Sequence, residues 1–462
     1  MLNTVNKITQ DVKPRLITLG EINITLLALS FLFSFQTFSQ TPNWLWAKQM
    51  SGTSQDYGYS IATDASSNVY ATGFFSGTVD FDPGTGTFNL TSAGMQDIFI
   101  SKLDASGNFV WAKQMGGTDN DYGSSISLDA AGNVYTTGSF QGTVDFDPGP
   151  GVFNLTAAGG WDIFVSKFDG SGNFTWAKRM GGISTDRSFS IALDLAGSGD
   201  VYTTGFFMGT ADFDPGAGVF NLNADATTDI FISKLDGSGN FVWAKAIGSA
   251  AGVIYSYSLA LDVSGNVYTT GDFWGTIDFD PGAAVFNLTP VGFWDIFISK
   301  LDASGNFVWA KQMGGTGSGK GYSSIASDVS GNVYTTGFFY ETVDFDPGVG
   351  TFNLTSASAG EYDIFISKLN GSGNFVWAKR VGGPDGDFAY SIALDAAGSV
   401  YTTGGFSGTV DFDPGTGTFN LTSAGDWEIF VSKLDGSGSF AWAKAVAGAT
   451  GSDFGQSIAL DA

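Results

Sequence analysis

Apolar residues fall in short runs that recur along the chain with a period of 65 to 67 residues. Within one period four runs stand out, at residues 125–129, 134–137, 163–168 and 174–178. They are rich in β-branched and aromatic side chains, which is typical of β-strands. We name these expected strands A, B, C and D. Turn sequences containing Gly and Asn separate A from B and C from D, and both residues tolerate the positive φ of tight hairpins.

Strand C does not alternate between apolar and polar residues. Its sequence Ile-Phe-Val at residues 163–165 places apolar side chains on both faces of a sheet. A lone four-stranded sheet of this kind is unstable in water and prone to edge pairing. Radially arranged sheets cover one another, so we predict an all-β fold, a β-propeller of four-stranded antiparallel blades. An open β-solenoid is the alternative, although its coils are normally much shorter than this period.

The expected strands are unevenly counted. Strands A and D each occur seven times, whereas B and C each occur six times. The chain begins with a D-type strand at residues 44–50 and stops at residues 458–462, where the next turn is expected. The sequence therefore predicts six complete blades plus a partial seventh. We expect it to be truncated at the C-terminus, because one more turn, B, insertion and C would let the first D strand close a seventh blade.

The first 40 residues differ in character from the rest. Three basic residues are followed by an apolar run at residues 22–35, and Glu21 interrupts any longer apolar span. This pattern predicts a secretory signal peptide at residues 1–40, with the propeller at 41–462 and no transmembrane span in the mature chain. We expect a secreted protein, extracellular or on the outer cell surface.

The composition excludes several classes of chemistry. The chain has no Cys and no His, which removes thiol nucleophiles, Ser-His pairs and ordinary zinc or haem ligation. It has 45 acidic and 20 basic residues, a net charge of −25. This charge repels nucleic acid, whereas divalent cations are natural partners.

The insertion between strands B and C carries the motif Asp-Phe-Asp-Pro-Gly. Its paired carboxylates are hard oxygen ligands of the kind that Ca²⁺ takes, so Ca²⁺ is the one cofactor the sequence suggests. The alternative is a Pro-Gly turn capped by an aspartate. Two carboxylates are too few for an EF-hand-type loop, which favours the turn. The candidate calcium ligands are Asp80, Asp82, Asp145, Asp147, Asp212, Asp214, Asp278, Asp280, Asp344, Asp346, Asp411 and Asp413.

The B–C insertions and the D–A links are expected at the same end of the blades, because the strands of a blade are antiparallel. These segments hold nearly all the variation between repeats, and binding tends to sit on variable loops held by a rigid frame. In four of six repeats an aromatic residue precedes strand C there: Trp161, Trp294, Tyr362 and Trp427. Their rings can stack on a glycan or a protein ligand, or pack onto the insertion.

A Trp-Ala-Lys sequence recurs in strand D, and we predict that its tryptophan packs between blades. Three recurring segments, residues 391–395, 331–337 and 363–369, resemble the bacterial β-propeller repeat family labelled SBBP. The resemblance extends over everything from Trp44 onward. It implies an exported or cell-surface propeller, and the family supplies no shared catalytic residues. The long insertion departs from the usual repeat.

These features favour a non-enzymatic scaffold for adhesion or ligand binding. One alternative is a glycan-active enzyme, a hydrolase or lyase that uses two Asp residues as acid and base. Against it, the motif aspartates recur in most repeats, so no carboxylate pair stands alone. The other alternative is a structural spacer within a larger surface protein.

Overall fold

The computed structural model of the protein describes residues 43–194, 199–224, 227–316, 318–446 and 451–461. All regular elements in this part of the chain are β-strands. The all-β repeat fold expected from the sequence is thereby confirmed. No helix of the described residues has the length and hydropathy that a membrane span requires. The expected signal peptide, residues 1–40, lies outside the described residues.

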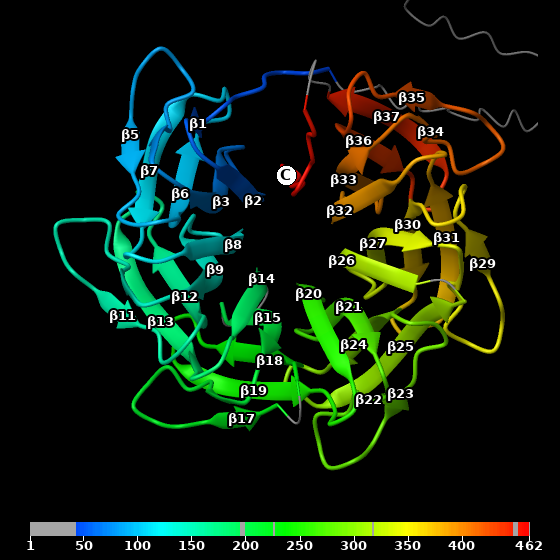
Figure 1. Cartoon of the computed structure of the whole chain (residues 1–462), viewed down its shortest axis with the longest axis horizontal. Coiled ribbons are helices and arrows are strands. Elements are labelled where there is room, and N and C mark those ends of the chain that lie inside the picture. The colour runs from blue at the N-terminus through cyan, green and yellow to red at the C-terminus, as the bar shows by residue number, and fades with distance from the viewer. Residues whose placement is uncertain (1–42, 195–198, 225–226, 317, 447–450, 462) are drawn as a thin grey trace, which may run out of the picture. The chain divides into compact units, whose positions relative to one another are not determined.

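Six repeats each contribute four strands, hydrogen-bonded side by side in the order A, B, C, D (Figure 1). The A strands are β2 (Asp56–Thr63), β8 (Asp121–Leu128), β14 (Arg187–Leu193), β20 (Val253–Leu261), β26 (Ser318–Ser327) and β32 (Asp387–Leu394). The B strands are β3 (Val69–Phe75), β9 (Val134–Phe140), β15 (Val201–Phe207), β21 (Val267–Trp274), β27 (Val333–Tyr340) and β33 (Val400–Phe406). The C strands are β6 (Asp97–Leu103), β12 (Asp162–Phe168), β18 (Asp229–Leu235), β24 (Asp295–Leu301), β30 (Tyr362–Leu369) and β36 (Glu428–Leu434). The D strands are β7 (Phe109–Met115), β13 (Phe174–Gly182), β19 (Phe241–Ile247), β25 (Phe307–Gly315), β31 (Phe375–Val381) and β37 (Phe440–Val446).

The hairpins close with the turns that the sequence predicts. In the C–D turn of repeat 1, Oδ1 of Asp104 accepts hydrogen bonds from the N–H groups of Ser106 and Asn108, at 2.9 and 2.8 Å. Gly107 in this turn has a φ of 75°, a conformation that glycine adopts without strain. The aspartate therefore replaces the hydrogen bonds that the bend removes from the strand ladder.

Neighbouring repeats bury each other's sheet faces. In one core cluster Ile163 and Val165 of repeat 2 pack with Ile191 and Val201 of repeat 3, and Phe231 joins them. Each of these side chains is buried. Phe164 of the same strand C packs in a different cluster, with residues of repeat 1, so strand C is covered on both faces, as its unbroken apolar run predicts.

The strand D tryptophans also pack between repeats, which confirms that prediction. Trp111 of β7 lies edge-on to Tyr70 of its own repeat, with ring centroids 6.1 Å apart. Its ring also lies against Gly172 in the C–D turn of the next repeat, where an added β-carbon would be 3.0 Å from Cδ2. Glycine at this turn therefore leaves room for the indole ring and also adopts the positive φ of the turn.

A comparison of two turn glycines of repeat 2 separates the effect of the positive φ from that of the contact with the indole ring. Gly132 and Gly172 have φ of 78° and 77°, but a β-carbon on Gly132 would meet no atom within 4 Å. We expect Gly132→Ala to lower the free energy of unfolding by about 1 kcal/mol, through left-handed backbone strain alone. Gly172→Ala must also displace Trp111, which adds about 1–3 kcal/mol. Chemical denaturation measures both, and equal losses would contradict the inter-repeat contact.

Each B–C insertion forms a short hairpin that joins consecutive repeats. The hairpins are β4 (Thr78–Asp80) with β5 (Asn89–Thr91), β10 (Thr143–Asp145) with β11 (Asn154–Thr156), β16 (Thr210–Asp212) with β17 (Asn221–Asn223), β22 (Ile277–Asp278) with β23 (Asn287–Leu288), β28 (Thr342–Asp344) with β29 (Asn353–Thr355), and β34 (Thr409–Asp411) with β35 (Asn420–Thr422). The first hairpin strand pairs with the end of the preceding repeat, as in β16 with β13 and β28 with β25. β4 pairs in the same way with β1 (Ser51–Gly52), which follows the first D-type segment.

Serines of the A strands link consecutive repeats at the inner side of the fold. In five of these links the Oγ of one serine accepts a hydrogen bond from a backbone N–H of the next A strand, and in two the link runs through Ile458 or Ser457, which form no strand; all seven measure 3.1 to 3.3 Å. The pairs are Ser60 with Ile126, Ser125 with Ile191, Ser190 with Leu259, Ser258 with Ile325, Ser324 with Ile392, Ser391 with Ile458, and Ser457 with Ile61. Residues 454–461 therefore lie between β32 and β2 (Figure 1). Within the described residues no strand pairing closes the sheets into a ring.

Candidate binding face

The antiparallel order places the D–A links and the B–C insertions at one end of every repeat. We call this end the link face. The starts of the A strands and the ends of the B strands lie there too. The predicted grouping of the variable segments on one face is thereby confirmed.

The four predicted aromatic residues lie on the link face and are partly buried. The Trp161 ring stacks on Tyr122 of β8, with centroids 4.9 Å apart and planes 14° apart. The Arg187 guanidinium of the next repeat lies 4.2 Å from the Trp161 ring, within cation–π distance. Trp161 therefore contacts the beginnings of two A strands, rather than only the insertion expected from the sequence.

The other three make contacts of the same kind. Trp427 lies 4.9 Å from Phe388 and 5.5 Å from Phe454, centroid to centroid. Tyr362 meets Phe338 at 5.2 Å, and Trp294 stacks on Tyr255 at 6.1 Å. Their packing role is observed, and ligand binding by Trp161, Trp294, Tyr362 and Trp427 stays a prediction.

In repeat 1, where glutamine replaces the aromatic residue, the link between repeats persists. Gln96 stands at the Trp161 position of repeat 1, and its Oε1 accepts a hydrogen bond of 2.6 Å from the hydroxyl of Tyr122. A polar side chain therefore joins repeats 1 and 2 at this position, whereas the buried hydroxyl of Thr228, its equivalent in repeat 3, has no hydrogen-bond partner among the described residues.

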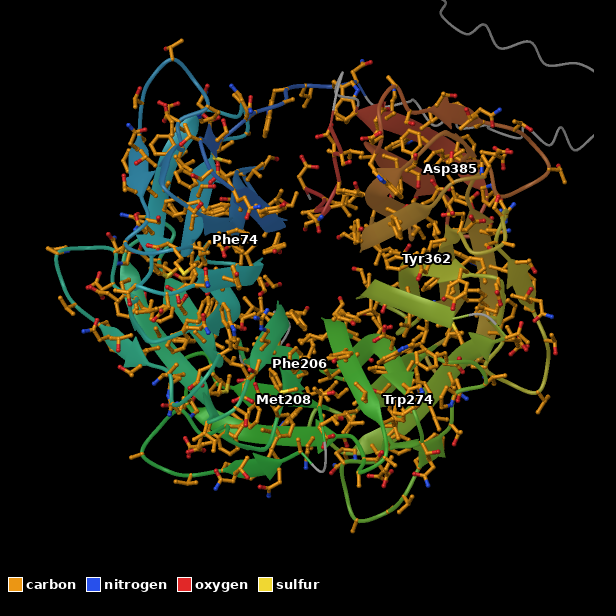
Figure 2. All side chains as sticks on the ribbon, in the orientation of Figure 1. Phe74, Phe206, Met208, Trp274, Tyr362 and Asp385 are labelled. Carbon is orange, nitrogen blue, oxygen red and sulfur yellow. The ribbon has the colours of Figure 1, made fainter. Side chains whose placement is uncertain are left out.

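Further aromatic residues complete this surface, and the sequence reasoning missed them. We define the link-face cluster as Tyr57, Tyr59, Phe74, Tyr122, Trp161, Arg187, Phe206, Tyr255, Trp294, Phe338, Tyr362, Phe388, Trp427 and Phe454. Figure 2 labels Phe74, Phe206 and Tyr362, which come from three different repeats. Tyr57 and Tyr59 are 47% and 37% exposed. The available signal was the aromatic residue that recurs near the start of strand A.

A second set of side chains, buried carboxylates, lies beneath the links. Asp97, at the start of β6, is fully buried, and its Oδ2 accepts hydrogen bonds from the Ala93 N–H and Gln114 Nε2. Asp121, at the start of the next A strand, is equally buried, and its Oδ2 accepts from the Gly117 N–H at 2.9 Å. Each carboxylate thus ties a link segment to a strand.

These carboxyls have strongly shifted pKa values. Burial, with the nearby Asp97 carboxylate adding to it, raises the pKa of Asp121 to about 7. The equivalent Asp186 is raised to about 6 and Asp387 to about 8, both mainly by burial. Raised carboxyl pKa values often mark acid–base catalysts. Here the groups are 0% exposed and recur in several repeats, so they fit a structural role better than substrate contact.

The Asp-Phe-Asp-Pro-Gly motif forms a capped loop. Oδ1 of Asp80 accepts from the N–H groups of Asp82 and Phe88, at 3.0 and 2.8 Å, and Oδ1 of Asp82 accepts from Gly84. The intervening Phe81 is buried against Phe75. The same bonds recur in the other five motifs. Among the described residues no group of three or more acidic side chains is arranged to hold a metal ion, and calcium binding stays a prediction.

Two segments of the chain, residues 45–73 and 110–139, match the model of the β-propeller repeat SBBP. The chain carries SBBP β-propeller repeats at these two places. Each matched segment runs from a D-type strand through the following A and B strands. The SBBP repeat in sequence therefore spans two structural repeats.

Two curated proteins are similar to the chain. Over 86% of its length it is 24% identical to an uncharacterized WD repeat-containing protein of Acanthamoeba polyphaga mimivirus. Over 34% of its length it is 26% identical to the regulatory protein FlaEY of Caulobacter vibrioides. The matches span 34% and 16% of those two proteins, so the chain corresponds to about a third of the first and about a sixth of the second.

Proposed function

We propose that the chain is a non-enzymatic β-propeller scaffold that binds a protein partner through the link-face cluster. The cluster itself is the observation that carries this proposal. Tyr, Trp and Arg, the residues that dominate protein-binding hot spots, gather there from successive repeats. Their mutual stacking fixes them before binding, which lowers the entropy cost of association.

The proposed scaffold has six complete blades and a partial seventh, to which both ends of the described chain contribute. The serine links support this arrangement, because Ser457 and Ile458 continue, without forming a strand, the series of bonds that joins the six A strands. So does Trp46 of the first D-type segment, whose Nε1 donates to the Ala105 carbonyl at 3.1 Å. We also propose that the scaffold is exported and serves adhesion, on the basis of the leader-like residues 1–40.

A random peptide display library, panned on the purified protein, tests the binding role. We expect enriched peptides whose affinity falls at least tenfold in the Tyr57→Ala, Tyr59→Ala double variant. Both rings are substantially exposed, so the variant should keep its fold. Val349→Ala, on a fully exposed insertion residue, is the matched control and should not change the affinity. Peptides that bind both variants equally, or cleavage of the bound peptide, would overturn the proposal.

A further inference from the structure

Pockets open at the outer margin of the fold, between one repeat and the next. One, of about 340 Å³, lies between repeats 1 and 2, and another, of about 310 Å³, lies between repeats 4 and 5. They are built from equivalent residues three repeats apart. Each is lined by an insertion hairpin, by strand D of the same repeat, and by the Asp-x-Asp-Pro loop of the next repeat.

One lining position distinguishes these two junctions from the others between the six complete repeats; the first D-type segment also has glutamine there, Gln49. The residue after the strand D lysine is Gln114 in repeat 1 and Gln312 in repeat 4. In the other repeats it is Arg179, Ala246, Arg380 and Ala445, so the order Gln, Arg, Ala occurs twice. The two pockets described above both lie where glutamine stands.

The glutamine is held rigidly. Nε2 of Gln114 donates to the Thr91 carbonyl at 2.8 Å and to Oδ2 of the buried Asp97 at 2.7 Å. Gln312 makes the equivalent bonds to Thr289 and Asp295, at 2.9 and 2.6 Å. With both amide N–H groups engaged, the amide oxygen is the group that the side chain can offer to a ligand. In repeat 2 Arg179 occupies the same place and pairs with Asp162.

The remaining lining combines an apolar side with both signs of charge. Phe88 and Leu90 form the apolar side, and the Phe88 ring is 38% exposed. Lys113 comes from strand D, and Asp147 comes from the opposing loop. The lysine would repel a cationic ligand, and the aspartates would repel an anionic one. A neutral molecule whose hydroxyl groups both donate and accept suits all of these groups.

We propose that the two glutamine pockets each bind a neutral monosaccharide or disaccharide unit. Their volumes lie at the lower end of the roughly 300–1,000 Å³ typical of ligand pockets, which matches one or two sugar rings. The apolar face of the sugar packs on Phe88 or Phe286, and its hydroxyl groups bond the amide, ammonium and carboxylate groups. Two such sites on one molecule bind a branched or surface-bound glycan with avidity.

Calorimetric titration with a panel of neutral and charged mono- and disaccharides tests this assignment. We expect a neutral member of the panel to bind with a stoichiometry of two. Gln114→Arg should reduce the stoichiometry to one, and Gln114→Arg with Gln312→Arg should abolish binding. Arginine is the native residue at the equivalent position of repeats 2 and 5, so these variants should keep the fold, which circular dichroism checks.

The control is the Tyr57→Ala, Tyr59→Ala variant, which leaves both pockets intact and should bind sugar unchanged. This control separates the rim pockets from the proposed role of the link face. Tighter binding of charged sugars, a stoichiometry of six, or binding unaffected by the arginine variants would overturn the proposal. So would a panel in which no neutral sugar binds with a Kd below about 10 mM, roughly 3 kcal/mol of affinity.

Discussion

Replacing Phe146 by alanine lowers the free energy of unfolding by about 3–5 kcal/mol. Phe146 is the middle residue of an Asp-Phe-Asp-Pro-Gly motif, in what the sequence presents as a surface insertion. In the structure its side chain is fully buried, 5.5 Å from Phe140 and 5.0 Å from Phe164 between ring centroids. The insertion therefore contributes a core residue, and truncating it leaves a cavity between two strands.

Phe153→Ala in the same insertion is the matched control. Its ring is 38% exposed and packs on Phe174 at the margin, so the expected loss is about 1 kcal/mol. Denaturant titration of both variants gives the comparison. Similar losses would show that the insertion is a peripheral loop, and the inferred coupling between the insertion and the sheet would be wrong.

The strand pattern could be predicted from the sequence because the apolar runs that form the core show little polar alternation and recur with a fixed period. The expected strand at residues 163–168 is β12 (Asp162–Phe168), and residues 134–137 begin β9 (Val134–Phe140). β9 continues through Gly138, beyond the end of the expected strand. A β-carbon on Gly138 would lie 1.9 Å from the Tyr122 carbonyl oxygen, so the glycine serves close strand contact rather than a turn.

The link-face cluster was only partly predictable. Trp161 was visible because it interrupts a Gly-rich segment just before strand C. Its partners Tyr122 and Arg187 lie 39 and 26 residues away, in strands of two different repeats. Their approach depends on how consecutive repeats pack, and no local pattern encodes that. The buried carboxylates were missed for a related reason, since a strand that begins with aspartate reads locally as an exposed turn.

The stability of the protein should fall as the pH rises from about 4 to about 8. Asp121, Asp186 and Asp387 have pKa values of about 7, 6 and 8 in the folded chain, against an ordinary value of 3.8. Between these limits the folded state keeps protons that the unfolded state releases, so deprotonation favours unfolding. The stabilisation is fully present below about pH 4 and is lost above about pH 8. Each of the three groups loses a few kcal/mol of stabilisation over this range, on the order of 1.4 kcal/mol for each pKa unit.

Turn aspartates change the stability in the opposite direction at lower pH. Hydrogen bonds from turn groups such as Asn108 hold the pKa of Asp104 below its ordinary value. Stability from such groups is present above about pH 4 and is lost as the pH falls further. Thermal unfolding from pH 3 to 9 should therefore give a maximum of stability near pH 4. A stability that stays constant or rises from pH 5 to 8 would contradict burial of the three carboxyls.

The Asp387→Asn variant tests how much of the loss of stability with rising pH comes from Asp387. Asp387 is fully buried, with Asp363 and Asp385 as the charged neighbours that raise its pKa beyond the effect of burial. The amide has nearly the same volume but does not titrate, so the variant should lose less stability than the wild type between pH 6 and 8.5. At pH 5, where the wild-type carboxyl is protonated, the variant should gain nothing.

Repeating both titrations in 1 M salt screens the exposed charges, including most of the net −25, but screens buried groups much less. A pH slope that vanishes in salt would therefore assign the effect to surface repulsion and not to Asp387.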